Sequence, residues 1–141
     1  MTTITADNML NRRSPWGWID HALDIVPGIV SVSTPSHGGI KLDRAHNAKV
    51  PDYMRHEGGW YEEDCDWAIP YCVFKDEILA GYPNARKVYF DDGKDIPKSC
   101  LGHWNPDGYE RFYGEVLLSG KSTMKDQAIF KAENVGNYVV T

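Results

Sequence analysis

The sequence lacks several patterns that would place the chain in a class at once. Cys65, Cys72 and Cys100 form an odd set without CxxC spacing, which favours free thiols over a disulfide framework. No apolar run approaches the roughly 18–20 residues of a membrane helix. The first residues have neither the basic start nor the apolar stretch of a signal peptide. We therefore expect a reduced, cytoplasmic protein with no membrane partner.

Positive charge is also scarce. The chain has 15 Lys and Arg against 20 Asp and Glu, a formal net charge of −5, and Arg12-Arg13 is its only pair of adjacent arginines. Duplex nucleic acid needs a concentrated basic patch, so direct binding to it is not expected. An acidic protein is better suited to the basic surface of a protein partner.

The residues that are present describe a globular protein. The 141 residues are 42% hydrophobic and 25% charged, which favours one folded domain with a substantial core. Five Trp, eight Tyr and four Phe are many for this size. Aromatic side chains dominate both cores and interface hot spots, so the composition leaves room for a binding face.

The order of patterns predicts a flexible N-terminal lead over residues 1–14 and a single α+β domain over 15–141. The domain is expected to hold a small antiparallel sheet packed by two to four helices. Apolar alternation and turn signals predict strands at 18–25, 29–33, 40–42, 86–90 and 137–140. Capping residues and helical spacing predict helices at 44–48 after Asp43, at 60–69, at 71–80 up to Gly81, at 108–113 and at 122–133. Pro70 is expected either to kink one helix or to separate the helices at 60–69 and 71–80. Residues 94–108 are expected to form a loop.

The densest chemistry lies between two tryptophans, over residues 58–67. Four carboxylates and a thiol follow one another there: Glu62, Glu63, Asp64, Cys65 and Asp66. In the first turn of a helix, the dipole would stabilise such carboxylates without any further function, an interpretation that we favour for Glu62 and Asp66. Glu63 and Asp64 are instead expected beside the indoles of Trp60 and Trp67, where a carboxylate has a raised pKa and serves as an acid or base.

His37 lies in a second candidate segment, residues 33–39, and is followed by Gly38 and Gly39. Two glycines at the end of a strand mark a close approach of the backbone to a ligand or to another strand. His37 is a candidate base or ligand, or a structural histidine bonded to a carboxylate. The two interpretations converge if Glu63 or Asp64 is its partner. A Cys65–His37 nucleophilic pair is a further candidate, although neighbouring carboxylates oppose a thiolate.

Other patterns in the sequence give weaker evidence of function. No HExxH or paired CxxC spacing is present, so we expect no metal site and no cofactor. Residues 120–123, Gly-Lys-Ser-Thr, imitate the end of a P-loop, but Gly114 is one residue too distant for it, which argues against nucleoside triphosphate binding. Trp104 lies in a segment rich in turn residues and is expected either to recognise a partner or to cover the core.

Three segments together resemble an uncharacterised family. They are Ser14-Pro15-Trp16-Gly17, the segment from Val32 to Ile40 (VSTPSHGGI), and the segment from Gly58 to Trp67 (GGWYEEDCDW). The family is a domain of unknown function met in phages, plasmids and proteobacterial genomes, and the resemblance covers roughly residues 14–115. It implies a mobile-element context and supplies no activity or catalytic residue.

These observations predict a small acidic phage or plasmid protein that acts by protein binding. Its expected partner is a host protein complex, and its expected effect is inhibition of a host defence complex, as an anti-CRISPR protein does. The residues expected to bind are His37, Trp60, Glu62, Glu63, Asp66, Trp67 and Trp104. One alternative is a hydrolase that uses His37 with Glu63 or Asp64, and with Cys65 in one version. A second alternative is a sponge for a signalling nucleotide, with Arg44 or Arg55 holding its phosphate.

Overall fold

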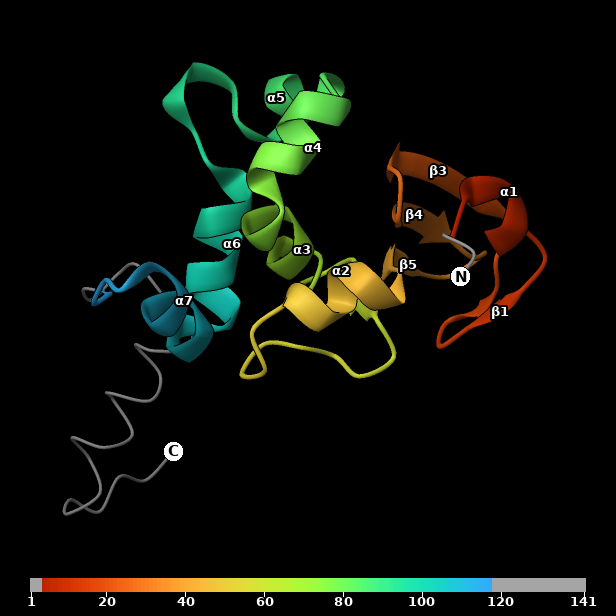
Figure 1. Ribbon diagram of the computed structural model, residues 1–141, viewed down its shortest axis with the longest axis horizontal. Coiled ribbons are helices and arrows are strands. Elements are labelled where there is room, and N and C mark those ends of the chain that lie inside the picture. Colours follow the sequence, from red (N-terminus) through yellow and green to blue (C-terminus); the bar gives the residue numbers. More distant parts are fainter. Residues whose placement is uncertain (1–3, 118–141) are drawn as a thin grey trace, which may run out of the picture. The chain divides into compact units, whose positions relative to one another are not determined.

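The computed structural model describes residues 4–117 (Figure 1). The predicted α+β class is confirmed, since these residues contain seven α-helices, a two-stranded antiparallel sheet and a four-stranded antiparallel sheet. The chain groups into two compact units, residues 1–97 and 98–141, which are taken separately below. The described helices outnumber the two to four that we expected.

The four-stranded sheet forms the centre of the first unit. It runs in the order β3 (His21–Val26), β4 (Ile29–Ser33), β5 (Gly38–Leu42) and β6 (Trp60–Glu62), each strand antiparallel to the next. Gly28 has a φ of +89° in the turn between β3 and β4, a conformation that favours glycine. Strands β3, β4 and β5 thus correspond to the strands predicted at 18–25, 29–33 and 40–42, and β6 adds a fourth strand.

One face of this sheet is covered by the N-terminal segment. Helix α1 (Ala6–Met9) begins at the capping box of Thr5, and Met9 packs with Ile19, Val30 and Val32 in a buried cluster. The short strands β1 (Arg13–Ser14) and β2 (Gly17–Trp18) pair with each other. We expected residues 1–14 to be a flexible N-terminal segment, but residues 4–14 contain helix α1 and strand β1. Burial of the apolar Met9 side chain against the sheet favours this ordered structure.

The opposite face carries Ile40 and Tyr61, which are paired across β5 and β6. Tyr61 is completely buried; its hydroxyl donates to Asn47 Oδ1 at 2.6 Å and accepts from the backbone N–H of His56 at 3.1 Å. Asn47 belongs to α2 (Arg44–Lys49), whose predicted cap Asp43 accepts from the His46 N–H. Tyr61 therefore joins β6, α2 and the segment before β6.

The predicted helix over 60–69 is wrong. Residues 60–62 form β6, which pairs with residues 39–41 of β5, and a turn follows before α3 (Ala68–Val73). A strand partner far away in the sequence outweighed the local helical spacing. The break that we expected near Pro70 falls at Phe74, since Pro70 lies in the first turn of α3 and costs no helical hydrogen bond there. Helix α4 (Lys75–Gly81) ends at Gly81 as predicted.

Two further predictions are wrong. Residues expected as a strand at 86–90 lie mostly in α5 (Asn84–Tyr89), with a 3₁₀ turn, η1 (Asp91–Gly93), after it. Part of the expected loop at 94–108 is helix α6 (Ile96–Trp104), which accepts Pro97 in its first turn. The prediction of a loop gave too much weight to Pro97 and Gly102, which this helix accommodates.

Helix α7 (Pro106–Tyr113) lies in the second unit and begins two residues before the predicted start at 108. The Asn105 side chain accepts from the Gly108 N–H at 3.0 Å, and Gly114 ends the helix with a φ of +67°. The elements predicted at 122–133 and 137–140, and the Gly-Lys-Ser-Thr segment, lie outside the described residues. None of the helices within 4–117 is long and apolar enough to span a membrane.

Candidate functional site: an acidic turn beside His37

The candidate site is the turn that links β6 to α3, which we call the acidic turn (residues 62–66). Its carboxylates are Glu62, Glu63, Asp64 and Asp66. The Glu63 N–H donates to the carbonyl of Gly38 at 3.0 Å, and the Trp67 N–H donates to the carbonyl of Glu62 at 2.8 Å. The Glu62 carboxylate also accepts from the backbone N–H of Asp64. These bonds tie the turn to the start of β5 and close it on itself.

The glycines beside His37 serve the sheet. A Cβ on Gly38 would lie 2.6 Å from the carbonyl oxygen of Val32, and one on Gly39 would collide with the Tyr61 backbone and the Trp16 ring. Of the two expectations, a ligand or another strand, the structure favours the strand, with the Trp16 ring beside it. Close packing at Gly38 and Gly39 brings residues 37 and 62–63 together.

His37 faces the acidic turn. Its backbone is held by Thr34, whose hydroxyl accepts from the His37 N–H at 3.1 Å and donates to the His37 carbonyl at 2.8 Å. The imidazole Nδ1 lies 3.4 Å from Glu63 Oε1, and Nε2 lies 3.7 Å from Glu62 Oε1. Glu63 was one of the two partners expected for His37, and the structure adds Glu62. These distances are those of an ion pair rather than of a short hydrogen bond.

The carboxylates of the turn are poorly neutralised. Within residues 4–117, none of the four makes an ion pair with Lys or Arg. Their cationic partners are His37 and His56, the latter 3.8 Å from Asp66. Glu63 and Asp64 are exposed, whereas Glu62 and Asp66 are half-buried. A histidine is charged only in part near neutral pH, so the turn presents net negative charge to solvent.

The local electrostatics change two members of the turn. Burial and the charge of Glu62 raise the pKa of Asp66, while His56 acts in the opposite direction. Burial first, and then the carboxylates of Glu62, Asp66 and Asp64, raise the pKa of the Cys65 thiol. A protonated thiol is a poor nucleophile, so this field works against a Cys65–His37 nucleophilic pair.

The same geometry brings metal-ligand types together. His37, Glu62 and Asp64 each offer one ligand atom, and these atoms lie within 4.8 Å of one another. Imidazole and carboxylate groups are ligands that Zn²⁺ and related divalent ions accept. The expectation of no metal site rested on sequence spacing, whereas this grouping arises because β5 and β6 are paired.

An aromatic pocket of about 410 Å³ adjoins the turn. Its wall includes Trp67, Tyr71 and Tyr89, whose ring centroids lie 4.8–5.4 Å apart in pairs. Glu63 also lines the pocket. Burial raises the pKa of the Tyr71 phenol, which therefore stays neutral. One carboxylate beside an aromatic wall suits a cationic or amphipathic group.

The structure brings most of the predicted binding residues together. His37, Glu62, Glu63, Asp66 and Trp67 belong to the turn or contact it. Trp60 is linked to it through Trp16, whose ring centroid lies 5.7 Å from that of Trp60 and 6.0 Å from that of His37. Trp104, 49% exposed, lies in the second unit.

Sequence reasoning missed Tyr71, Tyr89 and Trp16 as neighbours of the site. The i, i+4 spacing of Trp67 and Tyr71 would have indicated the first of them. Tyr89 carried no such signal, because its segment was predicted as a strand.

A comparison with protein families supports one part of the resemblance, that to an uncharacterised domain family. Residues 10–135 match a family described as Domain of unknown function (DUF7007). Comparisons with curated proteins and with solved structures each found no match.

Proposed function

The chain belongs to the domain family of unknown function DUF7007, and we propose that it acts by binding a basic surface of a partner protein through the acidic turn. The observation that carries this proposal is the lack of Lys or Arg partners for Glu62, Glu63, Asp64 and Asp66 within the described residues. Concentrated negative charge steers a positively charged partner and selects against acidic ones.

The aromatic pocket supports this proposal with a place for an anchoring side chain. Interfaces draw most of their affinity from a few residues that enter well-packed pockets. A Lys or Arg of the partner would place its charge beside Glu63 and its aliphatic stem against Trp67 and Tyr71. The acidic turn would then supply orientation, and the pocket would supply affinity.

The partner that we propose is a complex of the host cell. A small acidic protein of phage or plasmid origin, acting in the host cytoplasm, would occupy a basic nucleic-acid channel of a defence complex and inhibit it, as an anti-CRISPR protein does. The net charge of −5 supports this proposal, because a basic channel that binds phosphates also attracts carboxylates.

Affinity purification from the bacterial host, with charge-reversal variants, tests the proposal. The double variant Glu63→Lys/Asp64→Lys reverses two exposed carboxylates of the turn. We expect a stoichiometric host complex to co-purify with the wild type and to fall by about tenfold or more with this variant. Mass spectrometry of the eluate measures both.

Asp52→Lys/Asp76→Lys is the matched control. Both residues are exposed and lie in the first unit outside the turn, and their reversal changes the net charge equally. Equal loss in the control would mean that only net charge matters and would contradict a role of the turn.

A hydrolase remains the second candidate, because Glu63 both pairs with His37 and lines the aromatic pocket. An acid–base pair at the wall of a cavity is the arrangement that general acid–base catalysis needs. A wild-type protein that purifies without any partner would favour this candidate over the binding function.

A further inference from the structure

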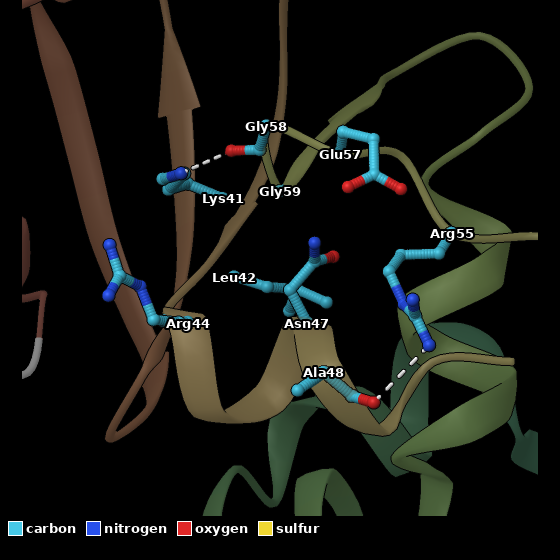
Figure 2. Close-up of a pocket in the computed structure, with 9 residues that line it drawn as sticks. All are labelled: Lys41, Leu42, Arg44, Asn47, Ala48, Arg55, Glu57, Gly58 and Gly59. Carbon is cyan, nitrogen blue, oxygen red and sulfur yellow. Dashed lines mark hydrogen bonds between the residues drawn. The ribbon is translucent and has the colours of Figure 1, made fainter. Parts of the chain in front are cut away.

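A second cavity, of about 390 Å³, opens between the end of β5, helix α2 and the segment 55–59 (Figure 2). We call it the basic pocket. Its charged lining residues are Lys41, Arg44, Arg55 and Glu57, three cations against one carboxylate. In a chain with a formal net charge of −5, this is a local excess of the opposite sign. The acidic turn does not contribute to the lining.

Two of the three cations, Lys41 and Arg55, are held by neutral groups. Lys41 Nζ donates to the carbonyl of Gly58 and lies 4.7 Å from the centroid of the Trp60 ring. Arg55 Nε donates to the Val50 carbonyl at 3.0 Å, and Nη2 reaches the Ala48 carbonyl at 3.4 Å. None of these partners is a carboxylate, and within the described part of the chain neither Lys41 nor Arg55 forms an ion pair with Asp or Glu.

Unused donors remain on each cation. A lysine ammonium has three N–H donors and an arginine guanidinium has five. Lys41 uses one of them and Arg55 two in the bonds above. Arg44 is exposed and makes no side-chain hydrogen bond or ion pair within residues 4–117. The pocket therefore presents several free charged donors, which is what an oxyanion requires.

The wall behind these donors is fixed. Asn47 is 9% exposed, and its amide is held by the Tyr61 hydroxyl and by the His56 carbonyl, which accepts from Nδ2 at 2.9 Å. Gly59 has a φ of +76°, and a Cβ there would lie 3.1 Å from Lys41 Nζ. Glycine thus lets the backbone approach Lys41 closely.

We propose that the basic pocket binds a phosphate-bearing small molecule, with Lys41, Arg44 and Arg55 as the charged donors. Arginine forks match phosphate oxygens in pairs, and lysine adds a point charge. The volume lies within the range of small-ligand sites. The cations line one cavity instead of following a track, which favours a small ligand over a nucleic-acid strand.

Two details of the pocket agree with this ligand. Burial lowers the pKa of the Lys41 ammonium, an effect that Asp43 partly opposes. A bound anion would reduce this penalty on the charged form. Glu57 is exposed on the rim of the same pocket, and its carboxylate competes with a bound anion.

Isothermal titration calorimetry with inorganic phosphate and with adenosine monophosphate tests the inference on the full chain. We expect binding of at least one probe by the wild type and a loss of about tenfold or more in affinity for Arg44→Glu. Glu57→Gln, which removes the competing charge, is expected to bind more tightly. The exposed Arg86 lies outside the pocket, so Arg86→Glu makes the same charge change and should shift the affinity less than about twofold.

Three results would overturn the inference. They are no binding of either probe at millimolar concentration, equal losses for Arg44→Glu and Arg86→Glu, or binding only of oligonucleotides with an affinity that rises with length. Thermal unfolding of each variant checks that the fold is intact, and Arg44 has no side-chain bond in the described structure whose loss would unfold it. The result is independent of the partner-binding test, because the acidic turn is unchanged in these variants.

Discussion

Within the acidic turn, burial and neighbouring carboxylates raise the pKa values of Asp66 and Cys65. The sequence already indicated that crowded carboxylates oppose a thiolate, and the raised pKa of Cys65 agrees with that expectation. The pairing of His37 with Glu63 was one of two options, because spacing along the chain does not say which carboxylate meets the imidazole. The pairing of β5 with β6 places the Glu63 carboxylate beside His37.

Replacing Asp66 by Asn is expected to stabilise the protein at neutral pH. The pKa of Asp66 is raised in the folded state, so folding favours its neutral form, and stability falls as pH rises from the ordinary value of 3.8 through the raised one. Asp66→Asn removes this penalty. Because the side chain is partly solvated, a rise in Tm of a few degrees at most is expected at pH 7.

Thermal unfolding of wild type and Asp66→Asn at pH 7 and pH 3 measures the effect. The difference should shrink at pH 3, where Asp66 is protonated in both states. A variant that is less stable than wild type at pH 7 would mean that attraction to His56 outweighs burial and the repulsion from Glu62.

Among the secondary-structure elements, strand β6 determines where the acidic turn lies. Its three residues pair with β5, place Tyr61 in the core and start the acidic turn. The local spacing predicted a helix there, and nothing local could reveal the partner strand. By contrast, the Asp43 cap, the Asn105 cap and the stop at Gly81 were predictable, since each depends on residues within one turn.

Tyr61→Phe is expected to destabilise the protein by about 1–3 kcal/mol. The change removes the hydroxyl that donates to the buried Asn47 Oδ1 and accepts from the part-buried His56 N–H, and leaves both groups short of a partner. Because Asn47 also lines the basic pocket, phosphate binding should weaken in parallel.

Urea unfolding measures the destabilisation of Tyr61→Phe. Tyr82→Phe, at a half-buried tyrosine without a hydroxyl bond in the described structure, is its control and should change the free energy of unfolding by no more than about 0.5 kcal/mol. Equal losses in both variants would assign the effect to the ring environment instead of the hydrogen bonds.

The whole molecule combines two charge preferences in its first unit. The proposed partner of the acidic turn is a basic macromolecule, and the proposed ligand of the basic pocket is a small anion. The net charge of the sequence indicated only a basic partner. A sum over the whole chain does not reveal the local excess of cations in the basic pocket.

The association rate with the purified partner should fall steeply with salt. Exposed charges are screened over about 10 Å at 0.1 M ionic strength, so steering by the acidic turn weakens as salt is added. We expect a decrease on the order of tenfold between about 50 and 300 mM salt, with a smaller change in the dissociation rate. Surface plasmon resonance over a salt series measures both rates, and a salt-independent association rate would contradict electrostatic steering.

The sequence by itself determined the α+β class, the strands within residues 21–42, the helix starts at Asp43 and Asn105, and the chemical character of residues 62–66. These follow from local preference and alternation, which act over a few residues. Only the tertiary structure decided that residues 60–62 are a strand, that His37 meets Glu62 and Glu63, and that Trp67, Tyr71 and Tyr89 share a pocket. It also gathered Lys41, Arg44 and Arg55 around one cavity. Such contacts join segments far apart in the chain, and their free energy comes from pairing and burial that no local pattern records.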